Sequence, residues 1–139
     1  MKNRKAIIVG LSSTKLKKSE KLFLLKYKPW GVILFTRNIS SFDQAKKLII
    51  DIKKCFKDNR YPILIDEEGG RVSRIRNLFD TTLFTSEYFS KIYQKDKKKF
   101  FLYYNIYINS ISSILKNLGI NINTVPVLDL RRAITNKIL

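Results

Sequence analysis

One short stretch of the sequence, YPILIDEEGGRVSRIR (residues 61–76), carries the side chains best suited to bind a polar ligand. Asp66, Glu67 and Glu68 follow the apolar run 63–65 and precede two glycines and three arginines. Ionised carboxylates are costly to bury unpaired, so we expect these acids to face solvent or a ligand. Arginine binds carboxylates and oxygen-rich ligands in forked geometry. The stretch therefore predicts a polar site, unless its acids and arginines only pair with one another at the surface.

Four short apolar runs predict the strands that would position this site. They lie at residues 5–10, 31–35, 63–65 and 120–125. Runs that are apolar throughout are typical of strands in a parallel sheet covered on both faces. Polar residues follow the other strands too, including Arg37 after the second strand and Asp129 after the fourth. Because sites in parallel α/β folds lie at the carboxyl ends of the strands, we expect these residues near the acids.

Amphipathic helices are predicted between the first three strands. We expect a helix from Ser19, as its N-cap, to about Lys28. A second helix begins at Ser41, where the S-x-x-Q spacing predicts a capping box with Gln44. Its apolar residues recur three and four positions apart, which indicates one face packed on the sheet.

A loop and two further helices are predicted before the last strand. The loop covers residues 77–85, a helix follows at 86–93, and a lysine-rich break at 95–99 precedes a longer helix that ends at Gly119. The aromatic residues of the long helix are compatible with a base-stacking or membrane face, but their spacing predicts a core-facing stripe. The alternation of strands and helices indicates a parallel α/β fold, either a small doubly wound sheet or part of a (β/α)8 barrel.

The chain is strongly basic, with Lys+Arg 28 against Asp+Glu 11, no histidine and a net charge of +17. Such a charge can reflect a nucleic-acid or anionic-membrane partner. The lysines are scattered over the outer faces of the predicted helices, and no recognised nucleic-acid module accompanies them. We therefore expect no nucleic-acid partner. A steep loss of DNA or RNA affinity with salt would indicate the opposite.

The single cysteine, Cys55, excludes an internal disulfide and fits a reducing compartment. Without a histidine to act as its base, it is expected to be a packing residue. The apolar run at 6–10 is too short for a signal-peptide core, and no stretch approaches the ~20 apolar residues of a membrane span. The sequence predicts a cytoplasmic protein with no membrane partner, cofactor or metal.

Three motifs, in order, resemble one enzyme family. GVILFTRN (31–38), DEEGGRVSR (66–74) and VPVLDL (125–130) resemble the amino-terminal half of family-three glycoside hydrolases. They are most similar to the bacterial β-N-acetylhexosaminidases of peptidoglycan recycling. The resemblance covers nearly the whole chain but about half of the family's barrel. It implies that residues 1–139 form an incomplete (β/α)8 barrel containing about its first four βα units.

The resemblance also implies roles for individual residues. Asp66 would accept hydrogen bonds from sugar hydroxyls, and Arg74 would belong to the same sugar-binding cluster. Asp129 would line the site, as would Arg37 by its position. Glu68 is interpreted as structural, pairing with neighbouring backbone or arginines. The family's aspartate nucleophile and histidine acid/base have no counterpart here, so we expect no catalytic residue in this chain.

The adjacent acids at 66–68 are not predicted to be a catalytic pair. Neighbouring residues at a strand end diverge, whereas the two carboxyl groups of a retaining glycosidase face each other at about 5 Å across the substrate. Catalysis is therefore expected from a different part of a longer protein.

The resulting hypothesis is an amino-terminal part of a retaining β-N-acetylhexosaminidase that removes terminal N-acetylglucosamine from peptidoglycan fragments. Its partners would be an N-acetylglucosamine-containing saccharide and a complementing carboxyl-terminal half, and it would be inactive alone. The alternatives are a non-catalytic remnant or module that binds a sugar or a protein partner, and a basic nucleic-acid-binding module. Half a barrel would expose strand edges and apolar surface, so the isolated chain is expected to aggregate or dimerise.

Overall fold

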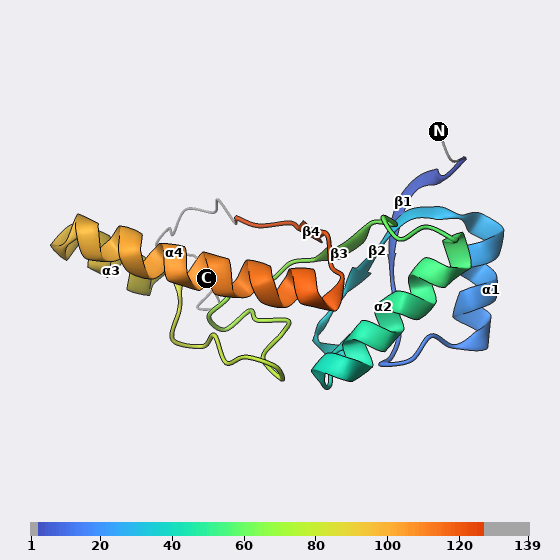
Figure 1. The fold of residues 1–139 in the computed structure, drawn as a ribbon, viewed down its shortest axis with the longest axis horizontal. Coiled ribbons are helices and arrows are strands. Elements are labelled where there is room, and N and C mark those ends of the chain that lie inside the picture. The colour runs from blue at the N-terminus through green and yellow to red at the C-terminus, as the bar shows by residue number, and fades with distance from the viewer. Residues whose placement is uncertain (1–2, 127–139) are drawn as a thin grey trace, which may run out of the picture.

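A single parallel sheet organises residues 3–126, the part of the chain that the computed structural model describes (Figure 1). Neighbouring strands pair in parallel and in chain order. The predicted parallel α/β fold is confirmed, although the second strand begins earlier and the fourth is shorter than expected. The strands are β1 (Lys5–Gly10), β2 (Pro29–Leu34), β3 (Ile63–Ile65) and β4 (Ile122–Asn123).

Helices connect the strands as predicted, but two of them start at different residues. The helices are α1 (Lys18–Tyr27), the 3-10 turn η1 (Thr36–Asn38), α2 (Phe42–Phe56), α3 (Ser86–Lys95) and α4 (Lys97–Leu118). The prediction of Ser19 as the first N-cap is wrong, because Ser19 lies inside α1 and Lys17 is the cap. Glu20 explains the earlier start, since its Oε2 accepts a hydrogen bond from the Lys17 N–H at 3.0 Å.

The start of α2 shows half of the predicted capping box. Ser41 Oγ accepts from the Gln44 N–H at 3.3 Å, as expected for an N-cap. The Gln44 side chain instead reaches one residue further back, where its Oε1 accepts from the Ser40 N–H at 2.8 Å. Its Nε2 donates to the Thr14 carbonyl, so Gln44 also ties α2 to the loop that follows β1.

The break between the last two helices is shorter than predicted. Asp96 alone separates α3 from α4, and its Oδ1 accepts from the Lys99 N–H at 3.0 Å. The N-cap therefore draws the lysines at 97–99 into the first turn of α4 instead of a loop. The helix ends at Gly119, which has a φ of 96° and is the predicted left-handed cap.

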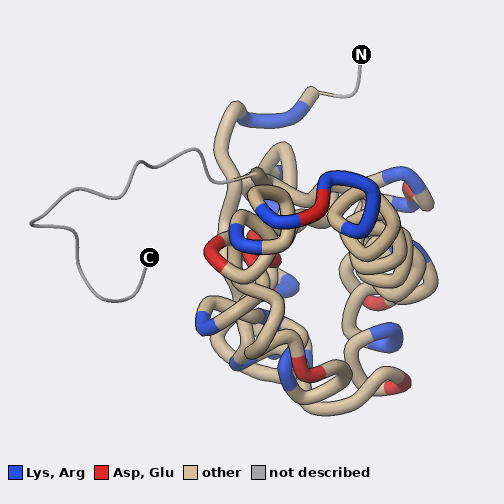
Figure 2. The backbone as a smooth tube through the Cα atoms, turned by 90° about the vertical axis from the view of Figure 1, so that its left-hand side faces the viewer, with Lys and Arg blue, Asp and Glu red and all other residues tan. Residues whose placement is uncertain are grey.

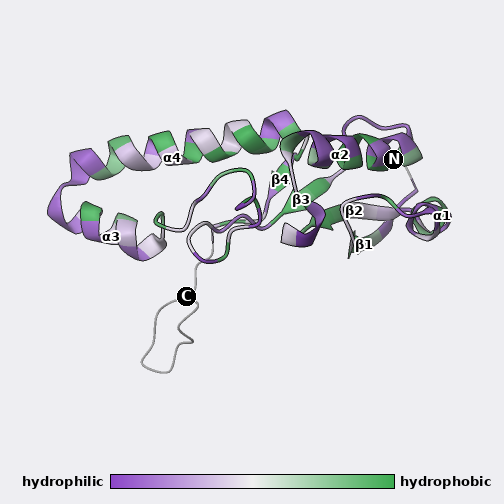
Figure 3. Cartoon of the chain, turned by 90° about the horizontal axis from the view of Figure 1, so that it is seen from below, coloured by the Kyte–Doolittle hydropathy of each residue, from purple (hydrophilic) through white to green (hydrophobic). Residues whose placement is uncertain are grey.

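One face of the sheet forms the core with the helices. Alternate residues of β2 and β3, such as Leu34 and Ile65, pack against Ile49 of α2 and Leu115 of α4. α2 and α4 lie side by side over this face (Figure 3). The opposite face is less covered, and Ile8 of the edge strand β1 is 48% exposed there. No helix within residues 3–126 is both long and apolar enough to cross a membrane.

Candidate functional site

The loops that follow the strands meet at one edge of the sheet, as the polar residues after each strand predict. The turn after β2 is held by Asn38, whose buried side chain accepts from the Phe35 N–H and donates to the Leu11 and Ser13 carbonyls of the loop after β1. Thr36 Oγ1 lies 3.4 Å from the Ser73 carbonyl in the loop after β3. These side chain–backbone contacts fix three loops relative to one another, which gives the edge a defined shape.

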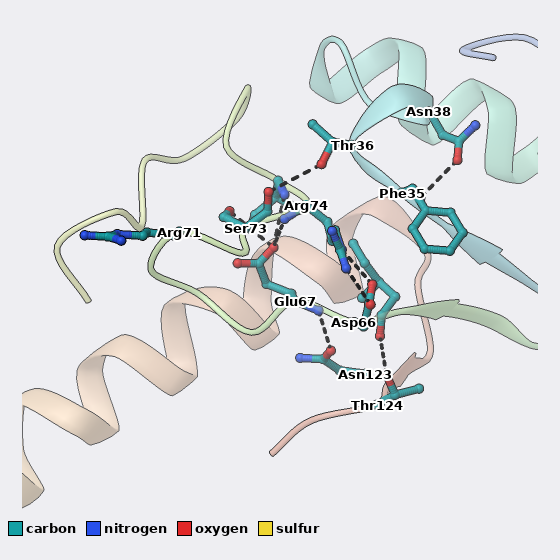
Figure 4. A network of polar contacts seen from close by, with 12 residues as sticks. Phe35, Thr36, Asn38, Asp66, Glu67, Arg71, Ser73, Arg74, Asn123 and Thr124 are labelled. Carbon is teal, nitrogen blue, oxygen red and sulfur yellow. Dashed lines mark hydrogen bonds and ion pairs between the residues drawn. The ribbon is translucent and has the colours of Figure 1, made fainter. Parts of the chain in front are cut away.

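Asp66 and Arg74 form a forked ion pair at this edge (Figure 4). Arg74 Nε donates to Asp66 Oδ1 at 2.8 Å, and Arg74 Nη2 donates to Oδ2 at 2.7 Å. The hydrogen bonds from Arg74 hold the pKa of Asp66 below its ordinary value, against the opposing effect of burial. The structure thus brings together the two residues that the sequence predicted as binding groups.

Two arginines approach the ring of Phe35, the residue that follows β2. The Arg74 guanidinium carbon lies 5.6 Å from the ring centroid, and that of Arg37 lies 4.5 Å from it. Arg37 Nε also donates to the Leu11 carbonyl at 2.8 Å. Arg37 therefore lies on the predicted side of the molecule, where Phe35 connects it to the Asp66–Arg74 pair through cation–π contacts.

Glu67 points the other way and anchors the loop after β3. It is only 3% exposed, and its Oε2 accepts from the N–H groups of Arg74 and Ile75 at 2.6 and 3.0 Å. The Ser73 hydroxyl lies 3.3 Å from the same oxygen. The expectation that all the acids face solvent or a ligand is wrong for Glu67, because three donors of one loop stabilise its buried Oε2. Its buried Oε1 accepts no hydrogen bond from residues 3–126.

The structural role expected for Glu68 is thus fulfilled by Glu67. The alternation of a strand continues past β3, so Ile63, Ile65 and Glu67 point to the core side while Asp66 points to the other side. The position of Glu67 two residues after Ile65 was the signal in the sequence that could have identified it. Glu68 is half-buried and adds negative charge near Arg74.

β4 completes the support of the third strand end. Asn123 Oδ1 accepts from the Glu67 N–H at 3.1 Å, and the Thr124 N–H donates to the Ile65 carbonyl at 2.9 Å. Sequence reasoning identified neither residue, because an asparagine in a short strand gives no local signal of its partner. The predicted site residue Asp129 lies outside the described residues.

The Asp66–Arg74 pair retains capacity for a ligand. The guanidinium has five N–H donors, and two of them are donated to Asp66, whose carboxylate offers about four acceptor positions. Arg71 points away from the pair (Figure 4). The side chains of Asp66 and Arg74 are 26% and 23% exposed, so water or a ligand reaches both. Within residues 3–126, no group of three or more His, Cys, Asp or Glu side chains is placed to hold a metal ion.

Comparison with known proteins identifies related enzymes. The curated β-hexosaminidase of Alkalilimnicola ehrlichii is 33% identical over 134 residues, which are 95% of this chain and 37% of that protein. The β-hexosaminidase of Thioalkalivibrio sulfidiphilus is 30% identical over 132 residues, or 95% of this chain and 38% of that protein. The chain therefore spans a little over a third of the length of these relatives.

A solved structure shows the same fold. NagZ from Neisseria gonorrhoeae, in complex with N-trifluoroacetyl-D-glucosamine, superposes with a TM-score of 0.80 at 29% identity, over 91% of this chain and 37% of that one. The model of the glycosyl hydrolase family 3 N-terminal domain matches residues 4–138. The family resemblance of the three motifs is confirmed: this chain belongs to glycosyl hydrolase family 3 and corresponds to the N-terminal domain of that family.

Proposed function

We propose that this chain forms the sugar-binding part of a β-N-acetylhexosaminidase that removes terminal N-acetylglucosamine from peptidoglycan fragments. The observation that carries the proposal is the forked Asp66–Arg74 pair at the carboxyl edge of the sheet. Family membership supports the reaction class, and the N-acetylglucosamine analogue bound by the gonococcal protein supports the kind of sugar. As a part of the family barrel, the chain would present this pair to a terminal sugar ring.

The chemistry of the pair suits a sugar with adjacent hydroxyl groups. A hydroxyl can donate to a free acceptor position of Asp66 and accept from an unused N–H of Arg74. Both contacts involve a charged partner, which makes them stronger than neutral hydrogen bonds. Because Glu67 fixes the Arg74 backbone, the two groups are held in place before the ligand arrives, which reduces the entropic cost of binding.

The acids described here are engaged in binding and support, which leaves catalysis to another part of the protein. Asp66 is bound by Arg74, and Glu67 is buried among the donors of its loop. The sequence has no histidine, the residue type expected as acid/base from the family resemblance. We propose that the nucleophile and the acid/base are supplied by a complementing carboxyl-terminal half, and that hydrolysis proceeds with retention in the cytoplasm.

Sugar binding by the chain tests the proposal directly. Saturation-transfer NMR of the 139-residue chain with N-acetylglucosamine should show transfer to the sugar protons. Asp66→Asn and Arg74→Lys should each weaken binding about tenfold or more, since a charge-assisted contact contributes about 1.5–3 kcal/mol. Asp43→Asn and Arg60→Lys change the same residue types at exposed positions and should bind like the wild type.

Two results would overturn the assignment. Unchanged binding by both Asp66→Asn and Arg74→Lys would remove the pair from the binding site. Turnover of a chromogenic N-acetylglucosaminide by the pure chain would refute the proposal that the chain is inactive on its own.

Co-expression with the carboxyl-terminal part of a relative tests the divided site. Turnover that appears only in this mixture, and is lost in Asp66→Asn, would support the divided site. Binding without turnover in that mixture would instead favour the non-catalytic sugar-binding module.

A further inference from the structure

The α3–α4 hairpin extends well beyond the sheet (Figure 1). Its two helices pack through an aromatic cluster in which Phe89 lies 4.9 Å from Tyr104 and Phe100 lies 5.1 Å from Tyr104, between ring centroids. Tyr107 joins this cluster 5.2 Å from Phe89. The first half of the inward side of α4 therefore packs on α3, and its second half packs in the core through Ile111, Leu115 and Leu118. The predicted packing stripe is confirmed.

The outward side of α4 is apolar as well. Phe101, Leu102 and Ile106 are 57%, 58% and 57% exposed, and Leu102 and Ile106 are one turn apart on the same side. Figure 3 shows hydrophobic bands along the length of α4. A helix that is apolar all round is normally buried on every side. In the described part of the chain nothing covers these three side chains, so they form a surface that favours an apolar contact.

Positive charge lies beside this apolar surface, in α3 and at the tip of the hairpin. Residues 86–109 carry five lysines, at positions 91, 95, 97, 98 and 99, against two acids, Glu87 and Asp96. Figure 2 looks at the molecule from the hairpin side and shows basic segments gathered where α3 passes into α4. Glu87 pairs with Lys91 at 2.8 Å, and Asp96 caps α4. The two acids offset only part of the charge of the five lysines, so the hairpin tip remains positively charged.

We propose that the α3–α4 hairpin docks onto an anionic lipid surface. Phe101, Leu102 and Ile106 would enter the boundary between headgroups and acyl chains, and the lysines at 97–99 would contact the lipid phosphates. Lysines beside exposed phenylalanine and leucine are the composition of helices that lie in the membrane interface. This proposal revises the sequence-based expectation that the protein has no membrane partner, and it is independent of the sugar site.

A second copy of the chain fits this surface less well. α4 contains no acidic residue, so two copies pairing through it would bring lysines together with no carboxylate on the helix to offset them. An anionic membrane satisfies both features at once, because it offers negative headgroups above an apolar layer. The tyrosines at 93 and 103, 42% and 39% exposed, add the amphipathic rings that favour such interfaces.

The docking surface leaves the neighbouring support of the sugar site intact. Tyr107 follows Ile106 in the sequence but lies on the inward side of α4, where its hydroxyl contacts Gly69 in the loop after β3. The three apolar anchors precede Tyr107 in the sequence. Leu102 and Ile106 take no part in the aromatic cluster, whereas Phe101 lies at its border, with its ring centroid 5.2 Å from that of Phe100. Substitutions at the anchors therefore test lipid binding without touching Asp66 or Arg74.

Vesicle flotation of the 139-residue chain tests the proposal. We expect binding to vesicles containing phosphatidylglycerol, little binding to pure phosphatidylcholine, and release at high salt. Lys97→Gln/Lys98→Gln/Lys99→Gln should weaken binding about a hundredfold, at about 1 kcal/mol per lysine. Leu102→Gln/Ile106→Gln should weaken it at least tenfold. Leu22→Gln/Leu25→Gln removes two exposed leucines of α1 and should bind like the wild type.

Several results would overturn the proposal. These are no binding to either vesicle, equal binding to both, or the same loss in the α1 control as in Leu102→Gln/Ile106→Gln. Full vesicle binding by Leu102→Gln/Ile106→Gln, with unchanged helix content by circular dichroism, would show that net charge alone causes the binding and that the apolar side chains do not enter the lipid. Dimerisation in sedimentation runs without lipid, abolished by Leu102→Gln/Ile106→Gln, would assign the surface to a second copy.

Discussion

Glu67 holds Arg74 by its backbone, with Oε2 accepting from the Arg74 N–H at 2.6 Å, while the adjacent Asp66 holds the Arg74 side chain. Two neighbouring acids thus bind one arginine at both of its ends, from opposite sides of the strand. Glu67 is only 3% exposed, so it cannot contact a ligand and instead positions Arg74. This arrangement leaves Asp66 and Arg74 accessible and in fixed orientation.

Loss of the Glu67 carboxylate should destabilise the loop that carries Arg74. In Glu67→Ala the buried donors of Arg74 and Ile75 lose their acceptor, which should lower the free energy of unfolding by about 3 kcal/mol. Glu67→Gln keeps one acceptor oxygen and should cost about half as much. Urea denaturation gives both values. Glu68→Ala, at the next position, should cost under about 1 kcal/mol; an equal loss there would contradict the anchoring role.

The Asp66–Arg74 pair should weaken in acid. The pKa of Asp66 lies below its ordinary value of 3.8 because Arg74 donates two hydrogen bonds to the carboxylate. The pair therefore contributes stability above pH 3.8, and this contribution is lost as the pH falls through the lowered pKa. The difference in unfolding free energy between the wild type and Asp66→Asn should shrink below pH 3.8.

A double-mutant cycle checks that this pH dependence belongs to the pair. In an Arg74→Met background the partner is already missing, so Asp66→Asn should have little effect on stability at any pH between 3 and 7. A difference between wild type and Asp66→Asn that persists unchanged in that background would show that another group shifts the Asp66 titration.

Tyr107 should make the fold sensitive to alkali. Burial first, and then the negative charge of Glu67, raise the pKa of Tyr107 from 10 to about 12. The folded state favours the neutral phenol, so this stability is complete below pH 10 and is lost as the pH rises towards 12. Tyr107→Phe should reduce that loss, measured by denaturation at several pH values.

The matched control for Tyr107 is Tyr103→Phe, on the exposed side of the same helix. Tyr103→Phe should lose the same free energy of unfolding as the wild type when the pH rises from 10 towards 12. Some loss should remain in Tyr107→Phe, because burial also raises the pKa of Tyr61. Identical alkaline profiles for the wild type and Tyr107→Phe would contradict the burial of the Tyr107 hydroxyl.

Gly69 is required for two separate reasons. Its φ of 78° is in the left-handed region, and an added Cβ would collide with the Tyr107 hydroxyl. Gly69→Ala should therefore lower the free energy of unfolding by about 2–3 kcal/mol. In a Tyr107→Phe background part of the collision is removed, and the cost should fall to about 1–2 kcal/mol, the strain of the backbone alone. An equal cost in both backgrounds would exclude the contact as a cause.

The sequence by itself determined the order of the strands and helices, and it placed Asp66 and Arg74 in one short polar stretch. Short apolar runs and regularly spaced apolar residues are local patterns, and they fixed β1, β3 and α2 closely. Asp66 and Arg74 are eight positions apart, and the two glycines between them turn the chain back. Their proximity therefore follows from one short stretch of sequence.

The tertiary structure alone decided the role of Glu67, the support from Asn38 and Asn123, and the open side of α4. Glu67 is tolerated in the core only because the loop at 73–75 folds back to supply its donors. Asn123 reaches Glu67 from 56 positions away, through a strand pairing that no local pattern encodes. The aromatic stripe of α4 predicted one packed side, but only the position of the hairpin, beyond the sheet, left the other side exposed.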